Sequence, residues 1–265
     1  MNLKHLISNS TYGTIGYVAS QNDLDVLQSY LVYNNPVLKE FNKIVFAFNT
    51  EDNSELVTKV EQLCSMYYPS SVCLFSEINR GHNFGTADLD NMVFDYCKQN
   101  GVKWLCKSAN DVILTEDVFD IEIEDADFYY MNGFSYETQY LNNFDIEQMN
   151  KNHFTPQTNF YFINVSKTDY LTDKTYLNET YIASKNITNY NGKIWEYIPG
   201  WSCEEFLAQC IERNNLTKFH LLSSTTYKKL YDAVKINKIG DPSHKNIMIN
   251  GICHFQFPDQ KVTVI

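Results

Sequence analysis

Between residues 12 and 111, short apolar runs alternate with longer segments in which apolar residues recur every three or four positions. The apolar runs predict buried strands at 12–19, 44–48 and 71–75, and a fourth strand that begins at Trp104. The segments between them predict helices at 24–35, 52–67 and 87–99. This alternation is typical of a parallel sheet with helices on both faces.

Local signals predict where these helices begin and end. Pro36 lacks the amide hydrogen that a helix interior needs, so we expect the first helix to end near Asn35 and a short turn to follow. Asp52 and Glu55 have the spacing of a capping box, which predicts the start of the second helix. Gly101 predicts the C-terminal end of the third.

The alternation stops after Asp111. The second half predicts aromatic-rich strands, a helix and a short strand-like run, in that order, at 127–131, 160–165, 204–213 and 219–222. No repeat or linker divides the chain. We therefore predict a single α/β domain over residues 1–265, with a mostly parallel central sheet, helices on both faces and a mixed C-terminal half.

The charge balance argues against a nucleic-acid partner. The chain of 265 residues carries a formal net charge of -11, and its only arginines are Arg80 and Arg213. Binding a phosphate backbone requires a basic face, so we do not expect this protein to bind nucleic acid.

The cysteines and the N-terminus give an expectation for location. None of the seven cysteines forms a CxxC pair, and several lie within apolar runs, as small buried residues do in a reducing compartment. The N-terminus has no apolar signal segment, and no run approaches the ~18 apolar residues of a membrane span. We expect a cytoplasmic protein without a membrane span.

Polar residues follow each of the first four predicted strands, at 20–21, 49–52, 77–85 and 107–111. The carboxyl ends of parallel strands meet at one edge of a sheet, and ligands of such sheets bind outside that edge. The sequence therefore predicts one polar crevice formed by these four segments.

Four segments resemble motifs of GT-A fold glycosyltransferases, and of their family-2-like members in particular. KSANDVIL (107–114) is similar to the segment in which an Asp-x-Asp motif ends a strand, and NRGHNFGTADLDN (79–91) to the stretch that opens the preceding helix. FNTEDNSELV (48–57) resembles the turn after the second strand, and GWSCEEFLAQCI (200–211) the start of a late helix that supplies the catalytic base.

This resemblance implies a hexosyltransferase-type enzyme that moves a sugar from a nucleotide-sugar donor, such as a UDP-sugar, to an acceptor hydroxyl of a glycan or other small hydroxyl compound. It implies a nucleotide-binding half at 1–111 and an acceptor-binding half at 112–265. The residues expected to contact the donor are Ala19, Ser20, Asn49, Glu51, Asp52, Asn79, Arg80, Gly81, His82, Asn83, Lys107 and Asn110.

The resemblance also implies Mn²⁺ or Mg²⁺ on the donor diphosphate, held by Asp111 and His254. Ala109 replaces the first acidic position of Asp-x-Asp, so one motif carboxylate remains, and Lys107 or Arg80 is the alternative source of positive charge. Asn110 and Asp111 also suit a simple turn after a strand, and His254 also suits a terminal strand without any ligand.

Glu204 and Glu205 are the candidates for the general base that an inverting transferase needs. Ser202 and Glu205 also have capping-box spacing, which is a structural explanation for Glu205. Trp201, just before them, suits stacking on an acceptor sugar or ordinary packing.

Two other functional classes remain open. A sugar nucleotidyltransferase of related fold carries a glycine- and lysine-rich loop after its first strand, and ASQND at 19–23 has neither residue. A non-catalytic nucleotide-sugar or glycan-binding domain would account for the incomplete Asp-x-Asp motif.

Overall fold

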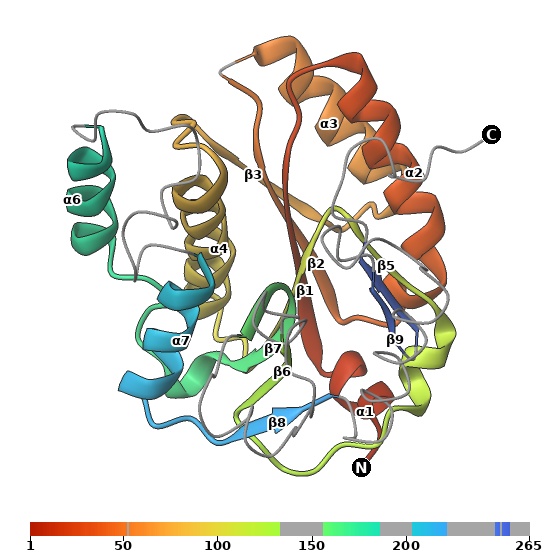
Figure 1. Ribbon diagram of the computed structural model, residues 1–265. Helices are drawn as coiled ribbons and strands as arrows, with labels where there is room; N and C mark the ends of the chain where they lie inside the picture. The colour runs from red at the N-terminus through yellow and green to blue at the C-terminus, as the bar shows by residue number, and fades with distance from the viewer. Residues whose placement is uncertain (52, 133–155, 186–202, 222–246, 250, 255–265) are drawn as a thin grey trace, which may run out of the picture.

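The computed structural model describes residues 1–51, 53–132, 156–185, 203–221, 247–249 and 251–254. Its centre is a seven-stranded sheet in the order β3-β2-β1-β4-β7-β6-β8 (Figure 1). The strands are β1 (Ser10–Tyr17), β2 (Lys43–Asn49), β3 (Val72–Ser76), β4 (Trp104–Ala109), β6 (Phe128–Asn132), β7 (Pro156–Asn164) and β8 (Lys218–His220). Only β7 runs antiparallel to its neighbours β4 and β6; the other pairs in this sheet are parallel.

Helices cover both faces of the sheet (Figure 1). The helices are α1 (Leu3–Ser8), α2 (Gln21–Leu38), α3 (Ser54–Tyr67), α4 (His82–Gln99), α6 (Lys174–Ser184) and α7 (Cys203–Arg213), with short 3-10 turns η1 (Glu116–Asp120) and η3 (Val165–Lys167). The α2 and α3 helices share one core cluster with the sheet, and α4 and α7 share a second. The predicted α/β architecture with a mixed second half is thus confirmed.

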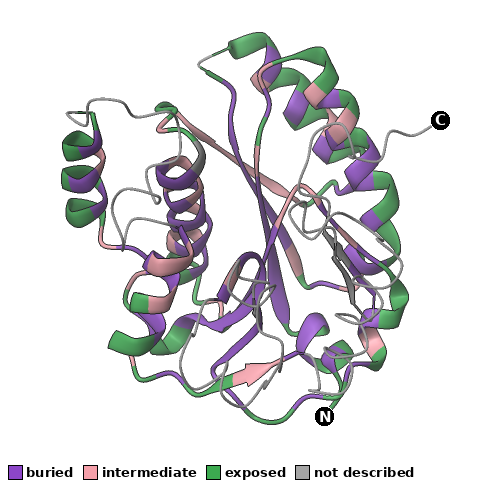
Figure 2. Cartoon of the chain, in the orientation of Figure 1, coloured by how far each residue is buried: buried purple, intermediate pink, exposed green. Residues whose placement is uncertain are grey.

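Strand β2 is apolar from Ile44 to Phe48 because both of its faces are buried (Figure 2). In β2, Phe46 and Phe48 pack toward α2 and α3, whereas Val45 and Ala47 pack toward α4. The α4 helix comes especially close at Gly13 of β1, where an added Cβ would lie 2.3 Å from a Val93 methyl carbon.

A second sheet of three strands lies beside α2, in the order β5-β10-β9. Its strands are β5 (Val112–Leu114), β9 (Ile247–Ile249) and β10 (Ile252–His254). The buried side chain of Asn34 in α2 donates to the Val112 carbonyl at 3.2 Å and accepts from the Leu114 amide at 2.7 Å. Asn34 therefore acts on β5 as a neighbouring strand would, and it fixes the chain just after Asp111.

Several expected boundaries were wrong. The α2 helix continues through Pro36 to Leu38, because Val37 and Leu38 are fully buried and their packing outweighs the one hydrogen bond that Pro36 cannot donate. The α3 helix is capped by Asn53, whose side chain accepts from the Glu55 and Leu56 amides, and not by Asp52. Asp52 itself lies outside the described residues.

The helix expected from Ala87 begins at His82 instead, directly after Gly81 with its positive φ of 79°. The α6 helix and strand β9 were not predicted as elements, and a terminal strand was considered only as an alternative for His254, the last residue of β10. Among the described helices, none has both the length and the apolar composition that crossing a membrane requires.

Candidate functional site

A cleft of about 510 Å³ opens at the carboxyl ends of β1, β2, β3 and β4. The chain moves outward from β1 to β2 and β3 and then returns to the other side of β1 as β4. Doubly wound sheets bind their ligands at such a reversal of strand order. The cleft is lined by Ile15, Gly16, Tyr17, Asn49, Ser76, Ile78, Asn79, Arg80, Gly81, Gly85, Thr86, Leu89, Lys107, Ala109, Asn110, Asp111, Gln157, Thr158, Asn159, Cys203 and Glu204.

The turn after β4 packs against the end of β1. The Asn110 amide donates to the Ile15 carbonyl at 3.1 Å, and a Cβ added at Gly16 would lie 2.8 Å from the Asn110 side-chain nitrogen. Glycine at position 16 thus makes room for Asn110. Asp111 follows in the same turn, which Asn34 holds from the other side through β5.

A polar cluster joins the ends of β1, β2 and β3. Glu51 Oε1 accepts hydrogen bonds from the Tyr17 hydroxyl at 2.6 Å and from Asn79 Nδ2 at 3.3 Å. The Glu51 amide donates to Asn49 Oδ1 at 3.2 Å and supports the left-handed backbone of Glu51, whose φ is 51°. The hydrogen bond to Glu51 also raises the pKa of the Tyr17 hydroxyl to about 12. The Glu51 carboxylate is therefore held in one place at the rim of the cleft.

The N-terminus of α4 forms part of the wall, through Gly81, Gly85 and Thr86. Gly81 is the N-cap residue and has no side chain to cap the helix. The partial positive charge of the helix start therefore faces the cleft without a capping side chain. The Gly81 amide donates to Asn79 Oδ1 at 2.9 Å, which shapes the approach to the helix.

Arg80 lies beside this helix start and ties α6 to it. Its Nε is 2.5 Å from Asp88 Oδ2, its Nη1 donates to Asn178 Oδ1 at 3.0 Å, and its guanidinium lies 4.9 Å from the centre of the Tyr181 ring. These contacts hold Arg80 at the cleft wall.

Lys107, expected to contact the donor, lies mostly below the cleft floor. Only 1% of its side chain is exposed. Its ammonium donates to the Thr158 carbonyl, lies 3.3 Å from Asp90 Oδ1 and sits over the Tyr161 ring. Burial raises the pKa of the Asp90 carboxyl to about 6; Lys107 opposes this rise, and the negative charge of Glu204 adds to it.

Glu204 reaches the cleft from the first turn of α7. Thr158 Oγ1 donates to its Oε1 at 3.2 Å, and Cys203 Sγ donates to its Oε2 at 3.2 Å. Burial, with the charge of Glu204, raises the pKa of the Cys203 thiol well above its usual value, so this thiol stays protonated and able to donate. Both carboxylate oxygens of Glu204 are therefore oriented by neighbours.

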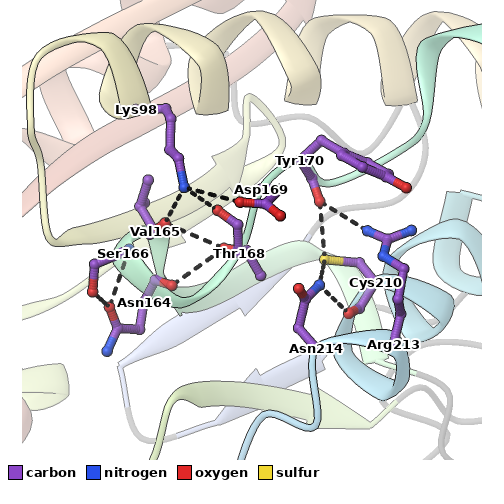
Figure 3. A network of polar contacts seen from close by, with 10 residues as sticks. All are labelled: Lys98, Asn164, Val165, Ser166, Thr168, Asp169, Tyr170, Cys210, Arg213 and Asn214. Carbon is purple, nitrogen blue, oxygen red and sulfur yellow. Dashed lines mark hydrogen bonds and ion pairs between the residues drawn. The ribbon is translucent and has the colours of Figure 1, made fainter.

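The far ends of α4 and α7 are tied to the segment after β7 (Figure 3). The Lys98 ammonium of α4 donates to the Thr168 carbonyl at 2.5 Å. The Tyr170 carbonyl accepts from Arg213 at 3.1 Å and from the Cys210 thiol at 3.4 Å, and the Arg213 guanidinium stacks 4.0 Å from the Tyr170 ring. These contacts fix the helix that carries Glu204 at its opposite end.

The structure brings together eight of the residues expected from the sequence: Asn49, Asn79, Arg80, Gly81, Lys107, Asn110, Asp111 and Glu204. Ala19, Ser20, Glu51, Asn83 and Glu205 do not line the cleft. Ser20 caps α2, and the Ala19 amide is bound to Asp23. Trp201 lies outside the described residues, as do the side chains of His82 and His254.

The sequence interpretation missed Asp90, Thr158 and Tyr17. A signal for Asp90 was present, because a lysine inside an apolar strand needs a buried counterion. No comparable signal marked Thr158, which reaches the cleft through the antiparallel pairing of β4 and β7.

The cleft supplies only part of a metal site. Asp111 and Asn110 provide oxygen donors suited to Mg²⁺ or Mn²⁺. Within the part of the chain that the structure describes, no three histidine, cysteine or acidic residues gather as a metal-binding group. A metal role for Asp111 and His254 therefore stays a prediction.

No protein-family model matches the chain, and no curated protein shows significant similarity to it. Two crystal structures of the galactosyltransferase LgtC align with it. The complex with donor and acceptor sugar analogues is 10% identical over 94% of this chain and 88% of that one, with a TM-score of 0.46. An active-site mutant of LgtC is 11% identical over the same shares, with a TM-score of 0.47. Likeness at this level does not identify an activity.

Proposed function

We propose that the protein is a glycosyltransferase that moves a sugar from a nucleotide-sugar donor to an acceptor hydroxyl. One observation carries the proposal: an oriented carboxylate, Glu204, lines a cleft at the reversal of strand order between β1 and β4. The position suits a nucleotide, and the carboxylate suits proton transfer from a hydroxyl.

The cleft has the size and polarity for such a donor. Its volume of about 510 Å³ lies within the range of small-molecule sites. The start of α4 supplies partial positive charge for a diphosphate, and Arg80, which is paired with Asp88, lies beside it. Tyr17 and Asn79, which Glu51 holds in place, supply hydrogen-bonding groups at the rim. A divalent cation, when bound through Asp111, would neutralise charge on the leaving diphosphate.

In the proposed reaction, Glu204 takes the proton of the acceptor hydroxyl as its oxygen attacks the anomeric carbon. The bond between that carbon and the donor phosphate oxygen breaks, and the nucleoside diphosphate leaves with the bonding electrons. Thr158 and Cys203 hold the carboxylate during this transfer. Glu205 does not line the cleft, so Glu204 is the better candidate for the base.

The test has a binding arm and a turnover arm. Calorimetry with a panel of nucleoside diphosphates, with Mn²⁺, with Mg²⁺ and with a chelator, should find at least one that binds. Release of nucleoside diphosphate from the matching nucleotide-sugars should then be measurable, and faster with an acceptor. Absence of binding up to millimolar concentration would contradict the proposal, and binding without turnover would favour a non-catalytic binding domain.

A further inference from the structure

A buried cation connects two carboxylates, Asp90 beside it and Glu204 in the lining of the cleft. Lys107 and Asp90 form the only ion pair of the described residues in which both side chains are less than a tenth exposed, at 1% and 8%. The separation of Lys107 Nζ from Asp90 Oδ1 is 3.3 Å, and this oxygen has no hydrogen-bond partner among the described residues. Asp90 therefore relies on the charge of Lys107 for its compensation.

The same ammonium is linked to Glu204 through one residue. Lys107 donates to the carbonyl of Thr158, and the hydroxyl of Thr158 donates to Glu204 Oε1 at 3.2 Å. Lys107 is thus paired directly with Asp90 and joined to Glu204 through Thr158 of strand β7.

The two carboxylates also interact through their charges. The negative charge of Glu204 contributes to the raised pKa of Asp90, so Asp90 lies within electrostatic reach of Glu204. The ionisable neighbours on β7 and α7 are Tyr161 and Cys203; burial raises the pKa of both well above neutral, so they stay uncharged. The balance around Glu204 therefore depends on Lys107 and Asp90.

We propose that Asp90 is a positioning residue for Glu204: its carboxylate keeps the Lys107 ammonium on the Thr158 carbonyl and away from Glu204. This inference rests on the proposed function, in which Glu204 must accept a proton. If Asp90 lost its charge, the ammonium would be drawn toward Glu204, the other carboxylate of this network, and its positive charge would make Glu204 a poorer base. Lys107 is then a structural cation and not a donor-binding one.

Carboxyl ¹³C NMR tests the coupling without any substrate. The Asp90 signal is assigned by its loss in Asp90→Asn, and its titration is followed in variants. Glu204→Gln should lower the pKa of Asp90 by roughly 0.5–1 unit, and Lys107→Met should raise it. Glu205→Gln is the matched control and should leave it unchanged. An Asp90 titration that does not move in Glu204→Gln overturns the proposal whether or not the protein is a transferase.

The pH dependence of nucleotide-sugar turnover tests the positioning itself. In Asp90→Asn we expect a lower rate and an acid limb displaced toward lower pH, because an uncompensated ammonium stabilises the charged base. The double variant Asp90→Asn/Lys107→Met removes both charges and should return the acid limb of the pH–rate profile to its wild-type position. The same variant can be compared with the wild type if the single variants do not fold. A loss of turnover in Asp90→Asn that is equal at every pH would indicate that Asp90 has a structural role alone, and it would overturn the proposal.

Discussion

Thr158 Oγ1 lies 3.2 Å from Glu204 Oε1, and this hydrogen bond joins the antiparallel strand β7 to the first turn of α7. Thr158 is buried, and its carbonyl receives the Lys107 ammonium. One residue therefore links the buried charge pair to the carboxylate in the cleft.

The Thr158 hydroxyl can be removed with little change in shape. Thr158→Val leaves Glu204 Oε1 without its donor. A hydrogen bond to a charged group is worth about 1.5–3 kcal/mol, so we expect turnover to fall by about ten- to a hundredfold with donor affinity nearly unchanged. Thr158→Ser keeps the hydroxyl and is the control. Steady-state kinetics and calorimetry on both variants separate the effects. Equal rates in Thr158→Val and the wild type would show that this hydrogen bond does not matter for catalysis.

Glu204 and Glu205 form a natural pair for comparison. Glu204→Gln should lower turnover by ~10²-fold or more while donor binding persists, the size usual for loss of a general base. Glu205→Gln should have little effect, because Glu205 does not line the cleft. Single-turnover rates with saturating donor decide between them. The reverse order of effects would move the base to Glu205, and full activity of both would indicate a mechanism without a base at this helix.

Asp111 provides a separate test of the metal prediction. Asp111→Ala removes the only carboxylate in the turn after β4, so nucleoside diphosphate binding should lose its dependence on Mn²⁺. Calorimetry with Mn²⁺ and with chelator measures this difference. Asp120→Ala, at an exposed site in η1, is the control. An unchanged metal dependence in Asp111→Ala would show that other residues hold the cation.

The predicted sheet was right where burial alone decides the pattern. The apolar runs in β2 and β3 and the start of β4 at Trp104 needed no tertiary information, because strands with a core cluster on each face carry apolar residues on both sides. The end of α2 was wrong because a local rule for Pro36 was outweighed by burial of Val37 and Leu38, which only the fold reveals.

The candidate site could be predicted from the sequence where its residues follow parallel strands. Asn49, Asn79 and Asn110 follow from the rule that parallel strands end at one edge. Thr158 could not be found this way, because its strand enters the sheet antiparallel and presents its beginning to the cleft. The α6 helix that holds Arg80 was missed because its few inward residues, such as Leu177 and Thr180, give a weak helical pattern.

Asn34 offers a test of how the turn after β4 is held. Asn34→Ala leaves the Leu114 amide and the Val112 carbonyl without this partner, which should lower the free energy of unfolding by about 1–3 kcal/mol. Asn35→Ala, on the exposed side of the same helix, should be neutral. Urea denaturation of the two variants gives the comparison, and equal stability would show that β5 does not depend on Asn34.

Asp90 also predicts how stability changes with pH. Its pKa is about 6 in the folded protein and near 3.9 in an unfolded chain, so between these values the folded state binds more protons. Stability from this group is therefore fully present below about pH 4 and is lost as the pH rises through 6. Two units correspond to about 3 kcal/mol as an upper bound.

The variant Asp90→Asn carries no titrating group at position 90, so this variant does not lose stability through that position as the pH rises. The free energy of unfolding of the wild type, minus that of Asp90→Asn, should therefore decrease by up to about 3 kcal/mol from pH 4 to pH 7. Urea denaturation at several pH values measures the difference, in which the titrations of other acids cancel. Asp120→Asn is the exposed control, and its difference from the wild type should stay flat. A flat difference for Asp90→Asn as well would mean that Lys107 keeps Asp90 ionised down to the pKa of the unfolded chain.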